Sequence, residues 1–171
     1  GNQLSNISLP NNLMNVGYAA FAGNNLGFIV LPANLEEVGA GAFINSNLNT
    51  VIFSEGLARI EQNAFANNVI TNLILPSTLK FIGKKAFYEN QINSIHYNAI
   101  GSVAEDAFNN NPIAQVTLNE TAGNPNINPP HIHLLGEVEI AVIQTKDGNF
   151  VDIPTSEITV IKEDIIYYQT N

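Results

Sequence analysis

The sequence contains no cysteine, which excludes disulfide bonds and thiolate chemistry but leaves the cellular compartment open. Charged side chains make up only 12% of the chain, and 6 basic residues stand against 15 acidic ones, for a net charge of −9. Such a surface repels phosphate backbones and anionic lipid headgroups, so we expect no nucleic-acid partner. There is also no run of about 18 apolar residues, so we expect no membrane insertion.

The N-terminal residues also lack the basic and then apolar segments of a signal peptide. Gly1 resembles the residue that a cleavage leaves behind, and a repeated pattern begins within the next few positions. We therefore expect that the sequence is a piece of a longer protein, in which any targeting segment would lie outside these residues.

The chain is rich in apolar residues and in asparagine. Hydrophobic residues are 45% of 171 positions, which is enough for one well-buried domain, or for one domain with a small appendage. Asparagine occupies about 27 positions, nearly one residue in six. An excess of this size in a chain with a packed core requires a structural explanation.

The pair Ala-Phe recurs at an interval of 22 residues, with one interval of 21. Around each pair the sequence follows the frame L-x-x-I-x-L-P-x-x-L-x-x-I-G-x-x-A-F-x-x-N, with five copies and the start of a sixth. A unit of this length cannot bury its own apolar face, so the copies must stack into a solenoid with one continuous core. The pairs are Ala20-Phe21, Ala42-Phe43, Ala64-Phe65, Ala86-Phe87 and Ala107-Phe108.

Each position of the frame, here called a slot, has a structural interpretation. The I-x-L slots predict a short strand whose apolar side chains, such as Ile7 and Leu9, point inward. The proline suits the end of that strand, the glycine marks a sharp bend, and the Ala-Phe pair places a ring in the core. The last slot holds Ser46 in one copy; asparagine in the others can hydrogen-bond backbone groups of the turns. Those asparagines are Asn24, Asn68, Asn90 and Asn111.

This frame resembles the BspA-like class of leucine-rich repeats over residues 4–118. With the repeat count, the resemblance implies a leucine-rich repeat solenoid, α/β or mostly-β and strand-rich, of about five and a half 22-residue coils. It also implies a cell-surface or secreted protein, since repeats of this class are associated with adhesion to host proteins or to other cells. One departure is the asparagine or serine in a slot where the family often has cysteine.

We divide the chain into a solenoid at residues 1–118, a loop rich in proline and asparagine at 119–133, and a β-rich segment at 134–171. Residues 146–149 predict a hairpin turn between two strands of the last segment. This segment either caps the open end of the solenoid, forms a small β-domain, or begins a separate module. Its predicted strands are 137–144, 150–153, 158–161 and 165–168.

The outward residues of the repeated strands are the best candidate site. On the concave side of the sheet, Val30, Ile52 and Ile74 should form an exposed apolar stripe, because adjacent strands lie about 4.8 Å apart. Exposed apolar patches rimmed by polar groups tend to mark interaction surfaces. Alternatively, β-branched residues simply favour strands, or the C-terminal segment covers them. The candidate partner-binding residues are Phe28, Val30, Thr50, Ile52, Asn72, Ile74 and His96.

A zinc site is the most specific of the weaker candidates. His131 and His133 share one face of an extended segment, with Glu137 and Glu139 nearby, and two histidines with a carboxylate can bind zinc. This spacing is common by chance, and loops flanked by proline are often just exposed. We therefore predict no metal.

Three further patterns favour structural interpretations. Residues 147–149 lack the additional acidic ligands of a calcium loop and fit a hairpin turn. His96 has no serine or cysteine nucleophile that can be placed beside it. Residues 83–85, Gly-Lys-Lys, lack the earlier glycine of a phosphate-binding loop, and their equivalents in other copies are not basic. They are interpreted as surface lysines on the repeated bend, and the acidic pairs 36–37 and 105–106 as solvated.

We therefore predict a non-catalytic protein-binding or adhesion module, extracellular or on a bacterial cell surface, that is monomeric and needs no cofactor. Its partner would be a protein of the host matrix or of another cell's surface. Two alternatives stay open. One is a structural spacer that presents another domain, and the other is a targeting module for an enzyme whose catalytic domain lies outside these residues.

Overall fold

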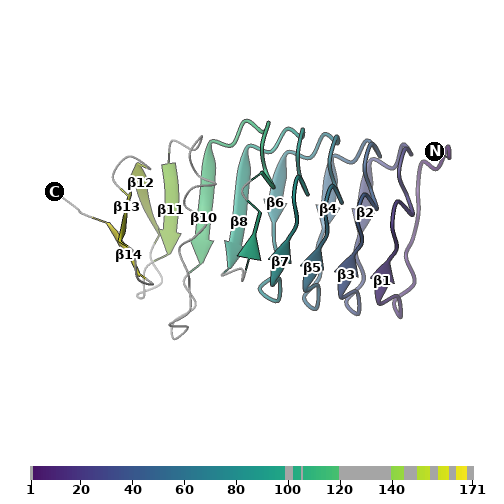
Figure 1. The fold of residues 1–171 in the computed structure, drawn as a ribbon, viewed down its shortest axis with the longest axis horizontal. Helices are drawn as coiled ribbons and strands as arrows, with labels where there is room; N and C mark the ends of the chain where they lie inside the picture. The colour runs from purple at the N-terminus through teal and green to yellow at the C-terminus, as the bar shows by residue number, and fades with distance from the viewer. Residues whose placement is uncertain are drawn as a thin grey trace.

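Successive copies of the frame wind into coils that stack side by side in a row (Figure 1). The first coil lies at the right of the figure, and later coils follow toward the left. The computed structural model describes residues 2–98, 102–104, 106–119, 140–144, 150–154, 158–161 and 165–168. These residues form strands and turns and no helix, so the solenoid is of the mostly-β kind.

Coils 2 to 5 each contribute two short strands, one from the I-x-L slots and one from the slots just before the glycine, whereas among the described residues coil 1 contributes only the second kind and the sixth copy only the first. Neighbouring coils run in the same direction, so the strands within each set that form ladders pair in parallel. The first set consists of β2 (Phe28–Val30), β4 (Thr50–Ile52), β6 (Asn72–Ile74), β8 (Ser94–Asn98) and β10 (Gln115–Asn119). The second set consists of β1 (Asn15–Val16), β3 (Glu37–Val38), β5 (Arg59–Ile60), β7 (Phe81–Ile82) and β9 (Ser102–Val103).

The inward slots form one continuous core, as the frame predicts. Ile29 and Leu31 are completely buried, whereas Ile7 and Leu9 in the first coil, which contacts one neighbouring coil instead of two, are half-buried. A column of parallel phenylalanine rings runs through this core, with 5.2 to 5.3 Å between the centroids of neighbouring rings. The rings are those of Phe21, Phe43, Phe65, Phe87 and Phe108.

The predicted asparagine ladder is confirmed. Asn68 Nδ2 donates to the backbone oxygens of Phe43 at 2.8 Å and Phe65 at 2.9 Å, so one amide joins two coils. Asn68 Oδ1 accepts from the backbone N–H groups of Ser46 at 3.0 Å and Leu48 at 2.9 Å. The ladder thus pairs buried backbone groups that the turns leave without partners. Asn90 and Asn111 also donate to the phenylalanine oxygens of two coils.

Asparagine has a second role, in the backbone of the turns. Two slots, each two residues after the frame glycine or phenylalanine, hold left-handed backbone with φ between 50° and 66°. Asparagine tolerates this region better than most residues with a Cβ. It fills these slots at Asn45, Asn63, Asn67 and Asn110, so backbone geometry explains a further part of the asparagine excess.

The frame glycine is needed for space in the interior coils. Gly39 and Gly83 lie outside the left-handed region, but a Cβ on either would lie 2.7 Å from a backbone atom of the preceding coil. At Gly17, in the first coil, a Cβ would meet nothing within 4 Å. Glycine in this slot therefore allows neighbouring coils to approach closely.

The predicted C-terminal strands are present in the described residues. β11 extends the solenoid sheet by pairing in parallel with β10, and β12 pairs antiparallel with β11. β13 and β14 pair antiparallel in a sheet of their own. Residues 120–139 and 145–149 lie outside the described residues, so the domain boundaries stay a prediction. The strands are β11 (Ile140–Gln144), β12 (Phe150–Pro154), β13 (Ile158–Ile161) and β14 (Ile165–Tyr168).

Candidate functional site

The seven predicted partner-binding residues, here called the exposed strand face, lie on β2, β4, β6 and β8. In β2, β4 and β6 the central residue is buried and both flanking residues are exposed, since successive side chains of a strand point to opposite sides. Phe28, Val30, Ile52 and Ile74 expose 49%, 47%, 51% and 71% of their surface. Side chains of this size would gain free energy if a partner removed them from water.

Strand pairing aligns this face as the frame predicts. Val30 stands opposite Ile52 in the ladder between β2 and β4. Ile74 stands opposite His96 in the ladder between β6 and β8. The structure thus brings the predicted residues together in two pairs of adjacent strands.

The two pairs belong to separate hydrogen-bonded sheets in the described part of the chain, because β4 and β6 form no ladder. The interruption coincides with the third coil, where Phe53-Ser54 replaces the Leu-Pro of the frame. The Ser54 hydroxyl donates to the Leu31 oxygen at 2.6 Å. The Phe53 ring packs edge-on against Phe65 and Phe87, at 5.8 and 6.4 Å between centroids. The apolar stripe therefore crosses a sheet boundary, which the sequence did not predict.

Neutral polar groups surround the apolar side chains. Thr50 Oγ1 donates to Asn49 Oδ1 at 2.8 Å, and Ser94 Oγ donates to Asn72 Oδ1 at 2.7 Å. His96, at the end of this face, is half-buried. None of the seven residues has a carboxylate or an amino group, so binding here would rely on apolar burial and neutral hydrogen bonds.

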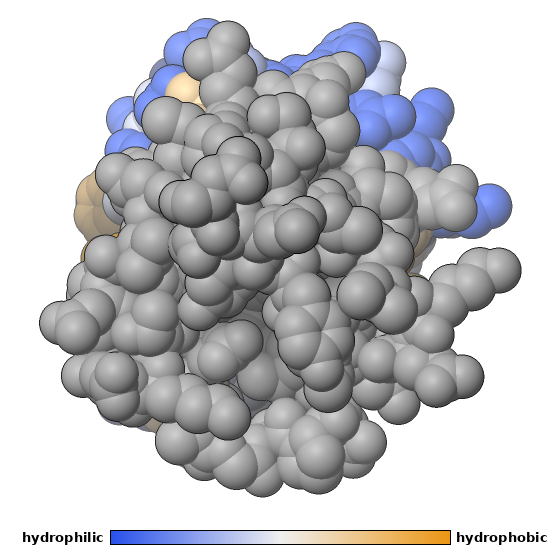
Figure 2. Space-filling model, turned by 90° about the vertical axis from the view of Figure 1, so that its left-hand side faces the viewer, coloured by the Kyte–Doolittle hydropathy of each residue, from blue (hydrophilic) through white to orange (hydrophobic). Residues whose placement is uncertain are grey.

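The side with the shorter strands has a different chemistry. Arg59 forms an ion pair with Glu61 at 2.7 Å, and its guanidinium lies 4.4 Å from the centroid of the Phe81 ring. Met14 and Tyr18 are exposed there at the first coil, outside the exposed strand face. Figure 2, which views the molecule from its C-terminal end, shows hydrophobic surface at one side and hydrophilic surface along the top.

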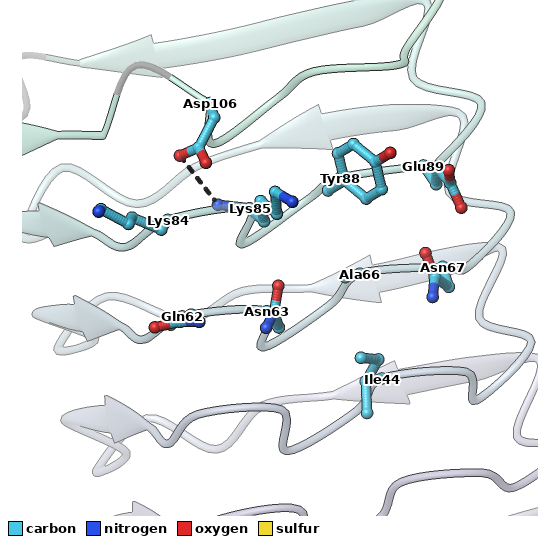
Figure 3. Close-up of a pocket in the computed structure, with 10 residues that line it drawn as sticks. All are labelled: Ile44, Gln62, Asn63, Ala66, Asn67, Lys84, Lys85, Tyr88, Glu89 and Asp106. Carbon is cyan, nitrogen blue, oxygen red and sulfur yellow. Dashed lines mark hydrogen bonds between the residues drawn. The ribbon is translucent and has the colours of Figure 1, made fainter.

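A groove of about 440 Å³ lies over the turns of successive coils (Figure 3). Lys84 and Lys85 line it; both are exposed, as expected for residues on the repeated bend. The groove itself was not predicted. Its sequence signal is the slot after the phenylalanine, where the small Ala66 lies between Ile44 and Tyr88 of the adjoining coils.

Charged and aromatic groups of the groove contact one another. The Lys85 ammonium lies 5.0 Å from the Tyr88 ring centroid, and the Lys85 backbone N–H donates to Asp106 Oδ1 at 3.3 Å (Figure 3). A hydrogen bond to the Glu89 carboxylate, with smaller contributions from desolvation and from the charge of Glu89, raises the pKa of the Tyr88 phenol.

The remaining candidates gain no support from the structure. His131, His133, Glu137 and Glu139 lie outside the described residues, as does the turn at 145–149. The described residues hold no group of three or more side chains able to bind a metal. Asp106 is half-buried and accepts an exposed hydrogen bond from the Lys85 backbone N–H, and Glu105 lies outside the described residues, so the interpretation of this pair as solvated stays a prediction.

The geometry fits the repeat that the frame suggested. The family model for the BspA-type leucine-rich repeat region matches residues 1–122, with 6 copies. The chain belongs to this family. Leucine-rich repeats generally mediate protein–protein interaction, and BspA-type repeats are usually found in surface proteins. The family is typically non-catalytic.

Two negative findings complete the description of the chain. Neither a curated protein nor a solved structure matches the chain. In the part of the chain that the structure describes, no helix has the length and apolar character needed to cross a membrane.

Proposed function

We propose that the chain is a non-catalytic adhesion module of a bacterial surface or secreted protein, and that it binds a protein partner through the exposed strand face. The observation that carries this proposal is the exposure of Phe28, Val30, Ile52 and Ile74, each about half or more, at outward positions of strands in adjacent coils, with Val30 opposite Ile52 in the ladder. Contiguous apolar side chains of this exposure, with a polar rim, are typical of interaction surfaces.

The mechanism of binding would be docking onto a rigid surface. The backbone below the face is fixed by the core residues Ile29, Val51 and Leu73, all buried at the centres of the strands. A surface that is already ordered loses little conformational entropy when a partner docks, so more of the apolar burial contributes to affinity. β-branched Val30 and Ile52 add to this effect because they have few rotamers to lose.

A pair of matched variants tests the proposal. Ile52 and Met14 are equally exposed, at 51% and 53%, but Met14 lies outside the exposed strand face. Purified extracellular-matrix proteins and intact cells of a second bacterial species serve as partners. Ile52→Asp should abolish capture of a partner that the unmodified chain binds, whereas Met14→Asp should leave capture unchanged. Capture lost equally in both variants, or in neither, would contradict the assignment of the face.

Two other outcomes favour the alternatives. If the chain is a spacer, the unmodified protein should capture no partner, and neither variant should capture one. A targeting module would lie beside a catalytic domain in the longer protein, and an activity would then depend on the repeats.

A further inference from the structure

The groove over the turns is built by the variable slots of four successive coils. Figure 3 shows its side chains in rows along the bends that precede and follow the core phenylalanines. None of them belongs to the exposed strand face, so a ligand in the groove would not compete directly for those residues. The groove is therefore a separate candidate site.

The hollow has a simple origin in the sequence. Ile44, Ala66 and Tyr88 occupy the same slot in three adjoining coils, and the alanine is the smallest of the three. Ala66 is 2% exposed and forms the floor, while the larger neighbours form two walls. One wall is aromatic, which provides a flat apolar surface.

The lining is polar but has no net charge. Lys84 and Lys85 contribute two positive charges, and Glu89 and Asp106 contribute two negative ones, so their sum is zero. In Figure 3, Lys84 lies at one end of the groove and Glu89 at the other. A strongly anionic or cationic ligand would meet a repelling group as well as an attracting one.

Between these charges stand neutral amides, which both donate and accept hydrogen bonds. They belong to Gln62, Asn63 and Asn67. Asn67 Oδ1 is enclosed and has no hydrogen-bond donor among the described residues. Because this oxygen is shielded from solvent, a ligand in the groove would meet the other amide groups of the lining instead.

We propose that this groove binds a neutral saccharide. A sugar hydroxyl both donates and accepts, as the amides and carboxylates of the lining require, and its carbon-bound hydrogens suit the Tyr88 ring and the Ala66 methyl group. An extended peptide that adds to a sheet would instead need a free strand edge, and no strand residue lines the groove.

Titration calorimetry with purified oligosaccharides tests this proposal. The neutral set contains oligomers of glucose, mannose, galactose and N-acetylglucosamine; an oligogalacturonate and an alternating Glu-Lys peptide are the competing ligand classes. We expect at least one neutral oligosaccharide to bind more tightly than the two competing ligands. The proposal is overturned if no neutral oligosaccharide binds, or if the uronate or the peptide binds at least as tightly.

Variants taken from the same slot of adjoining coils locate the binding. Ala66→Ile introduces the residue of coil 2 and fills the floor, so binding should be lost. Tyr88→Ala introduces the residue of coil 3 and removes the aromatic wall, so affinity should fall about ten-fold or more. Tyr18→Ala removes an equally large ring that is 83% exposed outside the groove, and affinity should not change. Cooperative thermal unfolding shows that a variant is folded. If Ala66→Ile and Tyr88→Ala are both folded and both keep full affinity, the saccharide does not bind in the groove and the proposal is overturned.

Discussion

The inward and outward side chains alternate along the same strands, yet they vary in different ways from coil to coil. The core slot after each alanine holds phenylalanine in all five coils. The outward slot between the two inward I-x-L positions holds Val30, Ile52, Ile74 and His96 in four successive coils. One set is constant because each ring must stack on the next, whereas the other lies on the outward side of the strands, where the ring column imposes no such requirement.

This difference indicates where stability and where binding reside. Constant inward residues share their contacts with two neighbouring coils, so losing one should weaken a large part of the solenoid. Outward residues contact few others, so a change there should affect a partner and leave unfolding nearly unchanged. Both candidate sites, the exposed strand face and the groove, are formed by slots that vary from coil to coil.

The largest effect is expected at the centre of the phenylalanine column. Phe65→Ala removes a fully buried ring that stacks between Phe43 and Phe87, and leaves a cavity. We expect a loss of about 3–5 kcal/mol in the free energy of unfolding. Urea unfolding measures it. Phe21→Ala, at the half-buried end of the column, should cost clearly less, and equal losses would contradict the shared-contact account.

The asparagine ladder should give the next largest effect. Asn68→Ala leaves the backbone N–H groups of Ser46 and Leu48, and two phenylalanine oxygens, without these partners. We expect a loss of roughly 2–4 kcal/mol, because unsatisfied buried groups cost about 1–3 kcal/mol each and water relieves part of this. Asn24→Ala is the control, since Asn24 bonds the phenylalanine oxygen of its own coil only. A smaller loss at Asn68 than at Asn24 would argue against the ladder.

Glycine in the frame should respond differently at the end and in the interior. Gly83→Ala places a Cβ 2.7 Å from the Gln62 backbone nitrogen and should destabilise by about 1–3 kcal/mol. Gly17→Ala meets no neighbour, and a less flexible unfolded chain should stabilise it by about 0.4–1 kcal/mol. The melting temperatures of the two variants, each compared with that of the unmodified protein, test this prediction. The same sign for both would show that glycine is needed for a reason other than space.

The smallest effect is a pH dependence on the surface. The Ser77 hydroxyl donates to Glu55 Oε2 at 2.8 Å, and this hydrogen bond, partly opposed by desolvation, lowers the pKa of Glu55 below its ordinary value of 4.5. A carboxylate with a lowered pKa adds stability above its unfolded pKa and loses it as pH falls through the folded value. The unmodified protein should therefore be slightly more stable than Glu55→Gln at pH 7, and the difference should shrink as the pH falls below 4.5 and through the folded pKa. A difference that is constant with pH would exclude this cause.

Sequence alone was sufficient for the features that repeat. The spacing of the Ala-Phe pairs predicted the solenoid, and the slot of Asn68 predicted a ladder of hydrogen bonds. The exposure of Ile52 also followed from strand alternation. These features depend on a residue's position in the frame, and every copy of the repeat contains the same pattern.

Features that depend on a difference between neighbouring coils were not predicted. The groove exists because Ala66 lies between larger residues of two other coils, and its signal appears only when one slot is compared across copies. The missing ladder between β4 and β6 coincides with Phe53-Ser54 in a single coil. The reason for the frame glycine also depended on a distance to the preceding coil, which no local pattern contains.

The central claim is that the exposed strand face binds a partner without contributing to stability. Its most direct test measures affinity for a captured partner and thermal unfolding together, for Ile52→Asp and Met14→Asp. The account predicts that Ile52→Asp loses at least about ten-fold in affinity with a nearly unchanged melting temperature, and that Met14→Asp changes neither. Full affinity in Ile52→Asp, or a loss of affinity that only follows a loss of stability, would contradict it.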